Sequence, residues 1–322
     1  MEDENGYHHP SMANNTMPSA PYSRRAPSPP FIHIPSTGQC GTVNTPNLLP
    51  SFENVDPSQL TLQDVMIITR NERQIATDRA VDWSYEKRRE AQKLVDFLYL
   101  GPNCVTKDHD WLRREGITMI LVARDSRLAS MKLNSVEKAA EALGITLQYV
   151  NVDGFDHLIS TFSLVVSSIN DHLLSIYHRQ AQEITEDGSM KIDPSTFTRG
   201  KVLITCESGN DRSAALAAAY IMAAFGKDMI TVLQFINISR FCCAFDEDVK
   251  RKLLCWEDLL RARAQVTRQA DMPRNALHAK RQFDDHFNGA GSNSKGFTQD
   301  QDQDQDMDRF EGRRVFAPFV DM

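Results

Sequence analysis

A stretch of nine residues constrains the fold of this chain more than any other part of its sequence. It reads Thr205-Cys206-Glu207-Ser208-Gly209-Asn210-Asp211-Arg212-Ser213. The apolar run at residues 202–204 is typical of a buried strand, and the alanine-rich run that follows the stretch is typical of a helix. The residues between these two runs must therefore form a tight loop at the helix N-terminus.

A loop in this position is suited to hold both an anion and a reactive thiol. Its backbone N–H groups and the positive end of the helix dipole stabilise a dianion and also a thiolate. Arg212 has a planar guanidinium that can hold two phosphate oxygens. Cys206 would attack phosphorus, and Ser213 would hydrogen-bond the sulfur when water displaces it. The predicted phosphate site consists of the backbone amides of Glu207, Ser208, Gly209, Asn210, Asp211 and Arg212.

This pattern resembles the signature of the cysteine-dependent protein phosphatases, His-Cys-x5-Arg-Ser/Thr, and within them the dual-specificity group. Residues 83–262 are similar to the serine/threonine/tyrosine-interacting (STYX-type) phosphatase-like proteins. The segments that carry this likeness are Trp83-Ser84-Tyr85, Arg88-Arg89-Glu90, Phe97-Leu98-Tyr99-Leu100-Gly101-Pro102, Gly116-Ile117-Thr118 and Arg240-Phe241-Cys242. Many STYX-type proteins have Gly in place of the nucleophile, whereas Cys206 makes hydrolysis possible here.

Three departures from the phosphatase signature predict low or selective activity. Thr205 stands where active relatives have the His that helps to keep the thiol ionised. Glu207 and Asp211 add carboxylates, and nearby negative charge raises the pKa of a thiol and weakens phosphate binding. The Asn-Pro-Asn-x-Gly-Phe segment, which supports the loop in the family, is replaced by residues 244–249.

The resemblance also implies a general acid, supplied by an Asp on a loop between a strand and the next helix. Asp153 and Asp156 both lie between an expected strand at 145–152 and an expected helix at 158–177. Asp153 is the preferred acid because it follows the strand directly, whereas Asp156 stands where a helix N-cap is expected. Asp211 is a third candidate, since some lipid phosphatases of the myotubularin type carry Asp just before the loop Arg.

The remaining pattern predicts an α/β fold that is dual-specificity phosphatase-like. Strands and helices alternate, which favours a mostly parallel central sheet of four or five strands with helices on both faces. The phosphate-binding loop would lie at a strand-to-helix junction, at the carboxyl edge where such sheets bind ligands. Strands are expected at residues 97–100, 117–123, 145–152 and 201–205. Helices are expected at residues 107–115, 134–143, 158–177, 214–225, 229–240 and 246–263, the second of them started by Asn134 with Glu137.

Composition divides the chain into a folded centre and two tails. Residues 1–57 hold ten of the 14 prolines and lack apolar periodicity, which predicts a disordered N-terminal tail. Residues 58–82 are expected to form a helical extension of a domain at residues 83–265, which carries a surface insertion at 183–199. Residues 266–322 are polar and include four Gln-Asp repeats, which predicts a disordered C-terminal tail.

The same composition argues against several kinds of partner. The six cysteines lack the paired spacing of zinc sites, so neither a metal nor a cofactor is predicted, and a reducing compartment, cytoplasmic or nuclear, fits. The longest apolar stretch, residues 214–225, is too short to span a bilayer, and no signal peptide opens the chain, so a soluble protein is expected. The net charge of -7 argues against nucleic acid and anionic membranes as partners.

Two functions of this pocket stay open on the residues alone. In the first, Cys206 is the nucleophile, Arg212 binds the phosphoryl group and Asp153 is the acid of a dual-specificity phosphatase acting on phosphotyrosine and phosphoserine/threonine. In the second, which the STYX-type resemblance implies, the loop binds phosphoproteins, protein kinases among them, or ubiquitin-ligase adaptors without turnover. A phosphoinositide phosphatase is a minor alternative, because Glu207 and Asn210 stand where lipid phosphatases usually place basic residues.

Overall fold

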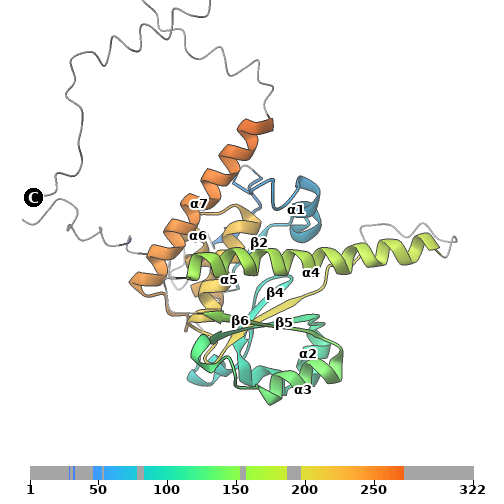
Figure 1. The fold of residues 1–322 in the computed structure, drawn as a ribbon. Coiled ribbons are helices and arrows are strands. Elements are labelled where there is room, and N and C mark those ends of the chain that lie inside the picture. Colours follow the sequence, from blue (N-terminus) through green and yellow to red (C-terminus); the bar gives the residue numbers. More distant parts are fainter. Residues whose placement is uncertain are drawn as a thin grey trace, which may run out of the picture. The chain divides into compact units, whose positions relative to one another are not determined.

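The computed structural model describes residues 29, 32, 46–52, 54–77, 83–152, 157–186 and 197–271 (Figure 1). Its central sheet has five strands in the order β3-β4-β7-β5-β6. Strands β4, β7, β5 and β6 are parallel, and β3 is antiparallel to β4. The prediction of a mostly parallel sheet is confirmed. The bounds are β3 Gln92–Val95, β4 Leu98–Pro102, β5 Met119–Asp125, β6 Thr146–Val152 and β7 Val202–Cys206.

Strand β3 was not among the expected strands. It has only four residues, and two of them, Gln92 and Lys93, are polar. Gln92 is nevertheless buried, because its side-chain oxygen accepts a hydrogen bond from Arg240, which lies far along the chain. A pattern of apolar residues cannot reveal a strand whose inward position is filled by a paired polar group.

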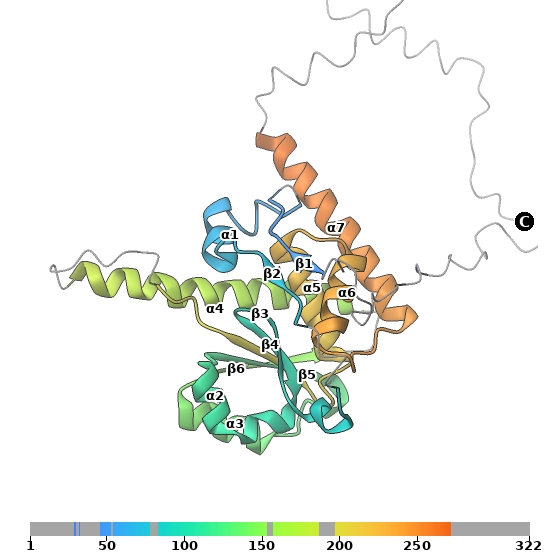
Figure 2. The same ribbon diagram turned by 180° about the vertical axis from the view of Figure 1, so that it is seen from behind.

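Helices cover both faces of the sheet, as Figures 1 and 2 show. Two of them, α2 and α3, lie on one face, and α1 and α4 to α7 lie on the other. Strand side chains alternate between the two cores that result, so that Leu203 packs toward α2 and α3 while Ile204 packs on the opposite face. The bounds are α1 Leu62–Thr69, α2 His109–Glu115, α3 Asn134–Leu143, α4 Leu158–Glu186, α5 Arg212–Phe225, α6 Met229–Ser239 and α7 Glu247–Asp271.

Helix α5 is the central element and positions the predicted loop. All its residues from Ser213 to Phe225 are buried. The alanines allow close approach of the sheet and of α4, α6 and α7, and Trp256 of α7 donates a hydrogen bond to the Ala219 carbonyl at 3.1 Å. A helix that is apolar all round is fixed by packing on every side, so its N-terminus is held rigidly against β7.

The folded region begins before residue 58, the boundary that composition predicted. Strand β1, Asn47–Leu48, pairs with β2, Gln74–Ile75, and Leu48 is fully buried in the larger core. The Ser51 amide donates to the Phe225 carbonyl at 2.8 Å, which fixes this segment to the end of α5. Composition missed this docking because a two-residue strand among prolines carries no periodic signal.

The helical extension at residues 58–82 contains α1, whose Thr61 and Asp64 form a capping box. Val65 and Ile68 of α1 are buried, so this helix packs on the core. At the other end, α7 runs past the expected boundary at 265, and Arg268 beyond that boundary donates to the Phe52 carbonyl at 2.9 Å. The rest of the predicted tails and most of the predicted insertion at 183–199 lie outside the described residues.

Helix α3 has the predicted bounds, Asn134–Leu143, but the expected capping box does not form. Leu133, and not Asn134, is the N-cap residue, and it makes no side-chain capping bond. Glu137 instead accepts a hydrogen bond from the Tyr149 hydroxyl of β6 at 3.3 Å. The Glu137 carboxylate, which a capping box would have used, is thus bonded to Tyr149 in the sheet.

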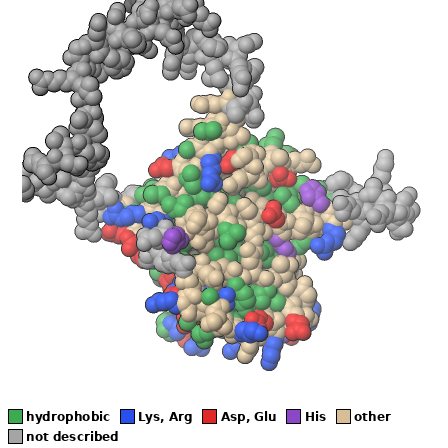
Figure 3. All heavy atoms as spheres, in the orientation of Figure 1, with side chains coloured by type: hydrophobic (Ala, Val, Ile, Leu, Met, Phe, Trp, Pro, Cys, Tyr) green, Lys and Arg blue, Asp and Glu red, His purple; other side chains and the backbone are tan. Residues whose placement is uncertain are grey.

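The described helices include none that is long and apolar enough to cross a bilayer. On the face drawn in Figure 3, basic and acidic side chains lie interspersed among polar and hydrophobic ones. Neither sign of charge therefore dominates the described surface seen from this side.

Candidate active site

Cys206 ends β7, and its sulfur lies inside the loop that leads into α5. The Ser213 hydroxyl donates to this sulfur at 3.0 Å and the Gly209 amide at 3.2 Å, while the Ser208 oxygen lies 3.8 Å away. The residue is only 1% exposed. The sulfur is therefore surrounded by donors of the loop, although the rest of the residue packs into the core.

These donors change the acidity of the thiol. Burial raises the pKa of Cys206, but the hydrogen bonds from the Ser213 hydroxyl and from the amides of Ser213, Asp211 and Gly209 lower it by more. The net effect places the pKa below the ordinary value of a cysteine. A depressed pKa favours the thiolate, which is the nucleophilic form.

Gly209 allows the loop to turn tightly. Its φ is +75°, in the left-handed region, and a Cβ there would collide with the Gly101–Pro102 backbone. No other residue fits this position without moving β4. The backbone thus explains a glycine that the sequence placed at the centre of the predicted phosphate site.

Arg240 supports the loop from its inner side. Its side chain is fully buried and donates to the carbonyls of Gly209 at 3.0 Å, Glu90 at 2.8 Å and Arg88 at 2.9 Å. It also donates to the Asn210 side-chain oxygen at 2.9 Å. In the sequence, Arg240 is a polar residue at the end of an apolar run and part of the STYX-type likeness. Neither feature indicates that its side chain supports the loop.

Two further contacts come from positions at which the chain departs from the family signature. The Ala244 amide, within the segment that replaces Asn-Pro-Asn-x-Gly-Phe, donates to the Asn210 carbonyl at 3.0 Å. Thr205, which stands at the position of the signature His, donates its hydroxyl to the Asn103 side-chain oxygen. Ala244 and Thr205 therefore each donate a hydrogen bond at or beside the loop.

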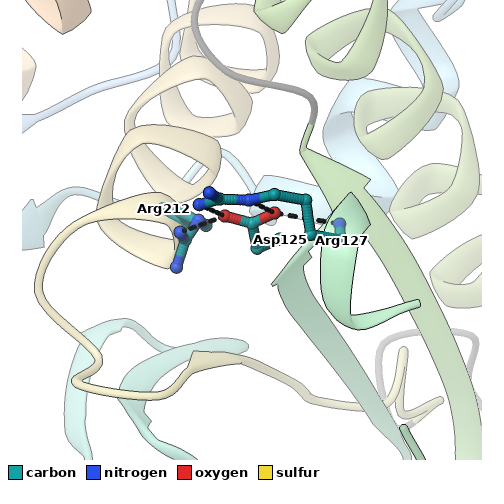
Figure 4. A network of polar contacts seen from close by, with 3 residues as sticks. All are labelled: Asp125, Arg127 and Arg212. Atoms are coloured by element: carbon teal, nitrogen blue, oxygen red, sulfur yellow. Dashed lines mark hydrogen bonds and ion pairs between the residues drawn. The ribbon is translucent and has the colours of Figure 1, made fainter. Parts of the chain in front are cut away.

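Arg212 lies on the outer side of the loop and pairs with a carboxylate that sequence reasoning missed (Figure 4). Its Nη2 donates to Asp125 Oδ2 at 3.1 Å, and Arg127 Nη2 lies 2.7 Å from the same oxygen. Side-chain and backbone hydrogen bonds from Arg127 hold the pKa of the Asp125 carboxyl well below its usual range. Asp125 ends β5, next to β7 in the sheet, so the position at a carboxyl strand edge is the signal that could have found it.

A main cavity of about 410 Å³ opens beside this ion pair. Arg212 and Asp211 belong to its wall, which also contains the apolar residues Val152, Leu158, Ala215, Ala244 and Val249 and the charged residues Asp125, Arg127 and Asp246. Apolar walls with a few converging charged groups are typical of ligand sites. The cavity could hold a phosphorylated side chain whose phosphate contacts Arg212.

The predicted general acids Asp153 and Asp156 lie outside the described residues. Val152 and Leu158, which flank that segment on either side, both line the main cavity. Asp211 precedes α5, is exposed and accepts a hydrogen bond from the Ser208 hydroxyl at 3.1 Å. The choice of Asp153 over the other two therefore stays a prediction.

Glu207 is exposed at the loop surface, and its side chain belongs to a different cavity from that of Asp211. In the described part of the chain, no three His, Cys, Asp or Glu side chains gather in the way that a metal ion requires. The site that the structure brings together consists of a buried sulfur, inward-facing amides and one arginine.

Comparison with known proteins gives a consistent result. Residues 98–259, half of the chain, match the family model described as "Dual specificity phosphatase, catalytic domain". The human serine/threonine/tyrosine-interacting protein is 27% identical over 165 residues, which are 51% of this chain and 62% of that protein. Dual specificity protein phosphatase 26 of Bos taurus is 31% identical over 125 residues, which are 39% of this chain and 47% of that protein. The chain therefore spans less than two thirds of the length of these relatives.

Among solved structures, the human tyrosine phosphatase-like serine/threonine/tyrosine-interacting protein is similar. The match has 21% sequence identity and a TM-score of 0.39, and it covers 53% of this chain and 97% of that one.

Proposed function

Because the chain belongs to the dual-specificity phosphatase family, we propose that it hydrolyses phosphotyrosine and phosphoserine/threonine in proteins, with low or selective activity. The observation that carries this proposal is the sulfur of Cys206, which accepts hydrogen bonds from Ser213 and Gly209 and has a lowered pKa. A lowered pKa favours the thiolate, which is the form that attacks phosphorus.

The proposed reaction has two steps. The Cys206 thiolate attacks phosphorus, and the bond to the seryl, threonyl or tyrosyl oxygen breaks while a general acid, proposed to be Asp153, protonates that oxygen. Arg212 and the loop amides stabilise the phosphoryl oxygens. Water then attacks the cysteinyl phosphate, and Ser213 stabilises the departing thiolate with the hydrogen bond seen at 3.0 Å. Inorganic phosphate leaves, and the thiolate is restored.

Two observations favour the second candidate, a STYX-type protein that binds phosphoproteins or ubiquitin-ligase adaptors without turnover. Arg212 already pairs with Asp125, and a phosphate must share this cation. Glu207 and Asp211 add negative charge at the loop. Both features weaken the hold on a dianion and slow a reaction that depends on it. The phosphoinositide alternative gains nothing from the main cavity, because three of its five charged residues are acidic.

The test is turnover of an aryl phosphate by the full chain and by Cys206→Ser, with the affinity for a phosphotyrosine peptide measured on both. The proposal predicts release of phosphate by the wild type alone and nearly equal peptide affinity for the two proteins. Turnover by the wild type that does not exceed that of the variant would reject the enzyme. Peptide binding by both proteins would then support the non-hydrolytic candidate.

A further inference from the structure

A second cavity, the side cavity, lies on the other side of Arg212 from the main cavity. It has a volume of about 240 Å³. Its wall includes the apolar residues Ala123, Leu128, Met131 and Leu133 and the loop residues Glu207 and Arg212. Asp125 and Arg212 belong to both cavities, so the ion pair between them forms the partition.

Two large apolar side chains of the side cavity are exposed to solvent. Leu128 is 45% exposed and Met131 is 56% exposed. Exposed apolar residues occur elsewhere on the described surface, for example Leu164 of α4 at 56%, so exposure alone singles out nothing. What distinguishes Leu128 and Met131 is that they share a cavity with two residues of the proposed phosphate loop.

The segment that carries these side chains is held in place by hydrogen bonds. The Ala129 amide donates to the Ser126 carbonyl at 2.9 Å, and the Met131 amide donates to the Leu128 carbonyl at 2.9 Å. Arg124 Nη1 reaches the Met131 carbonyl at 3.3 Å. A surface that is ordered before binding loses less entropy when a ligand arrives, which favours a binding role over an idle turn.

The position of the side cavity next to the main cavity indicates what would fill it. When Arg212 holds a phosphorylated side chain in the main cavity, the residues next to it in the peptide lie near the Arg212–Asp125 pair and the side cavity. In an extended peptide, side chains two positions apart lie on the same side, roughly 7 Å from each other. An apolar residue close to the phosphorylated one can therefore enter the side cavity while the phosphate stays on Arg212.

We propose that the side cavity is a specificity subsite that binds a large apolar side chain, of the Leu, Met or Phe type, next to the phosphorylated residue of a peptide. The subsite rests on the proposed function, because the phosphate anchors the peptide at Arg212. It does not depend on turnover, since a protein that only binds phosphopeptides would use the same contact. Leu128 and Met131 supply the apolar surface, and Asp125 separates the two subsites.

The experiment uses the full chain with Cys206→Ser, so that bound peptides are not hydrolysed. The reference phosphotyrosine peptide has serine at every flanking position. Each test peptide has leucine at one of these positions and serine at the others. Fluorescence polarisation compares their affinities. We expect one position near the phosphotyrosine at which leucine strengthens binding by about 5- to 20-fold, because a leucine side chain leaves water. Leu128→Ser, and separately Met131→Ser, in the same background should remove most of that gain.

Leu164→Ser is the matched control, since it removes an equally exposed apolar side chain from α4, outside the cavity. It should leave the gain from leucine intact. The subsite is wrong if peptides bind in a manner that needs Arg212 but leucine gives no gain, or if the gain survives both Leu128→Ser and Met131→Ser. Binding that is undiminished in Arg212→Ala, or absent altogether, would instead overturn the phosphate site and the subsite with it.

Discussion

The phosphate loop has an inner side and an outer side, and each is served by one arginine. Arg240, on the inner side, is fully buried and is bonded to backbone carbonyls of the loop and of the segment before β3. Arg212, on the outer side, has a side chain that is 37% exposed and, among the described residues, one ion pair, with Asp125. The two arginines therefore have different tasks. Arg240 fixes the shape of the loop, and Arg212 faces the cavity where a ligand can bind.

The largest effect is expected from Arg240→Ala. This change leaves the buried Gly209 carbonyl and the buried Gln92 side-chain oxygen without this donor, so the free energy of unfolding should fall by about 3 kcal/mol or more. Denaturant titration of the full chain measures it. Arg113→Ala, which removes an exposed arginine that pairs with Asp110, should cost less than about 0.5 kcal/mol. Equal losses for the two variants would refute the supporting role of Arg240.

Arg212→Ala should show the opposite behaviour. Affinity for a phosphotyrosine peptide should fall by about 100-fold, because a charged hydrogen-bond partner of the phosphate is lost. The free energy of unfolding should change by less than about 1 kcal/mol, since the side chain is partly exposed and an exposed ion pair contributes little. Calorimetric binding and denaturant titration on the same samples give both numbers. A large loss of stability with little loss of affinity would reverse the roles assigned to the two arginines.

Asp125→Asn should have a smaller effect that depends on Arg212. The carboxylate competes with a phosphate for Arg212, so its neutralisation should strengthen phosphopeptide binding by about 5-fold. In an Arg212→Ala background the same substitution should change nothing, and a double-mutant cycle measures the difference. If the gain is the same in both backgrounds, Asp125 acts on the site without Arg212. Because the pKa of Asp125 is depressed, the ion pair should persist at neutral pH and be lost only as the pH falls through that low value.

Ser213→Ala should have the smallest effect, a change in the acidity of the thiol. The Ser213 hydroxyl donates to the sulfur and thereby lowers the pKa of Cys206, so its removal should raise that pKa. At neutral pH the thiolate fraction would fall, and alkylation of Cys206 should slow by about 2- to 4-fold. An unchanged rate profile against pH would show that the backbone amides alone determine the acidity.

The two sides of the loop also differ in how much of them the sequence could predict. Cys206, Gly209, Arg212 and Ser213 lie within nine consecutive residues, and the strand and helix that flank them have clear local patterns. Local pattern was therefore enough to place the sulfur, the glycine and the donors in one loop. The sheet and most helices followed from the same kind of signal.

The partners of the loop could not be predicted, because they come from distant parts of the chain. Asp125 is 87 residues from Arg212, and Gln92 is 148 residues from Arg240. Such pairs exist only once the sheet brings β5 next to β7 and α6 next to β3. The strand β1 was missed for a related reason, since its two residues gain stability only from a tertiary partner. Asp153, chosen by resemblance, is still to be tested.

The most direct test of the central claim is the rate at which Cys206 is alkylated, measured against pH by mass spectrometry of its peptide in the full chain. Cys242 is the internal reference, because burial raises the pKa of its thiol. We expect a midpoint for Cys206 well below the value of about 8.5 of a free cysteine, and below that of Cys242. A midpoint at or above the free value would contradict an ionised nucleophile in this loop.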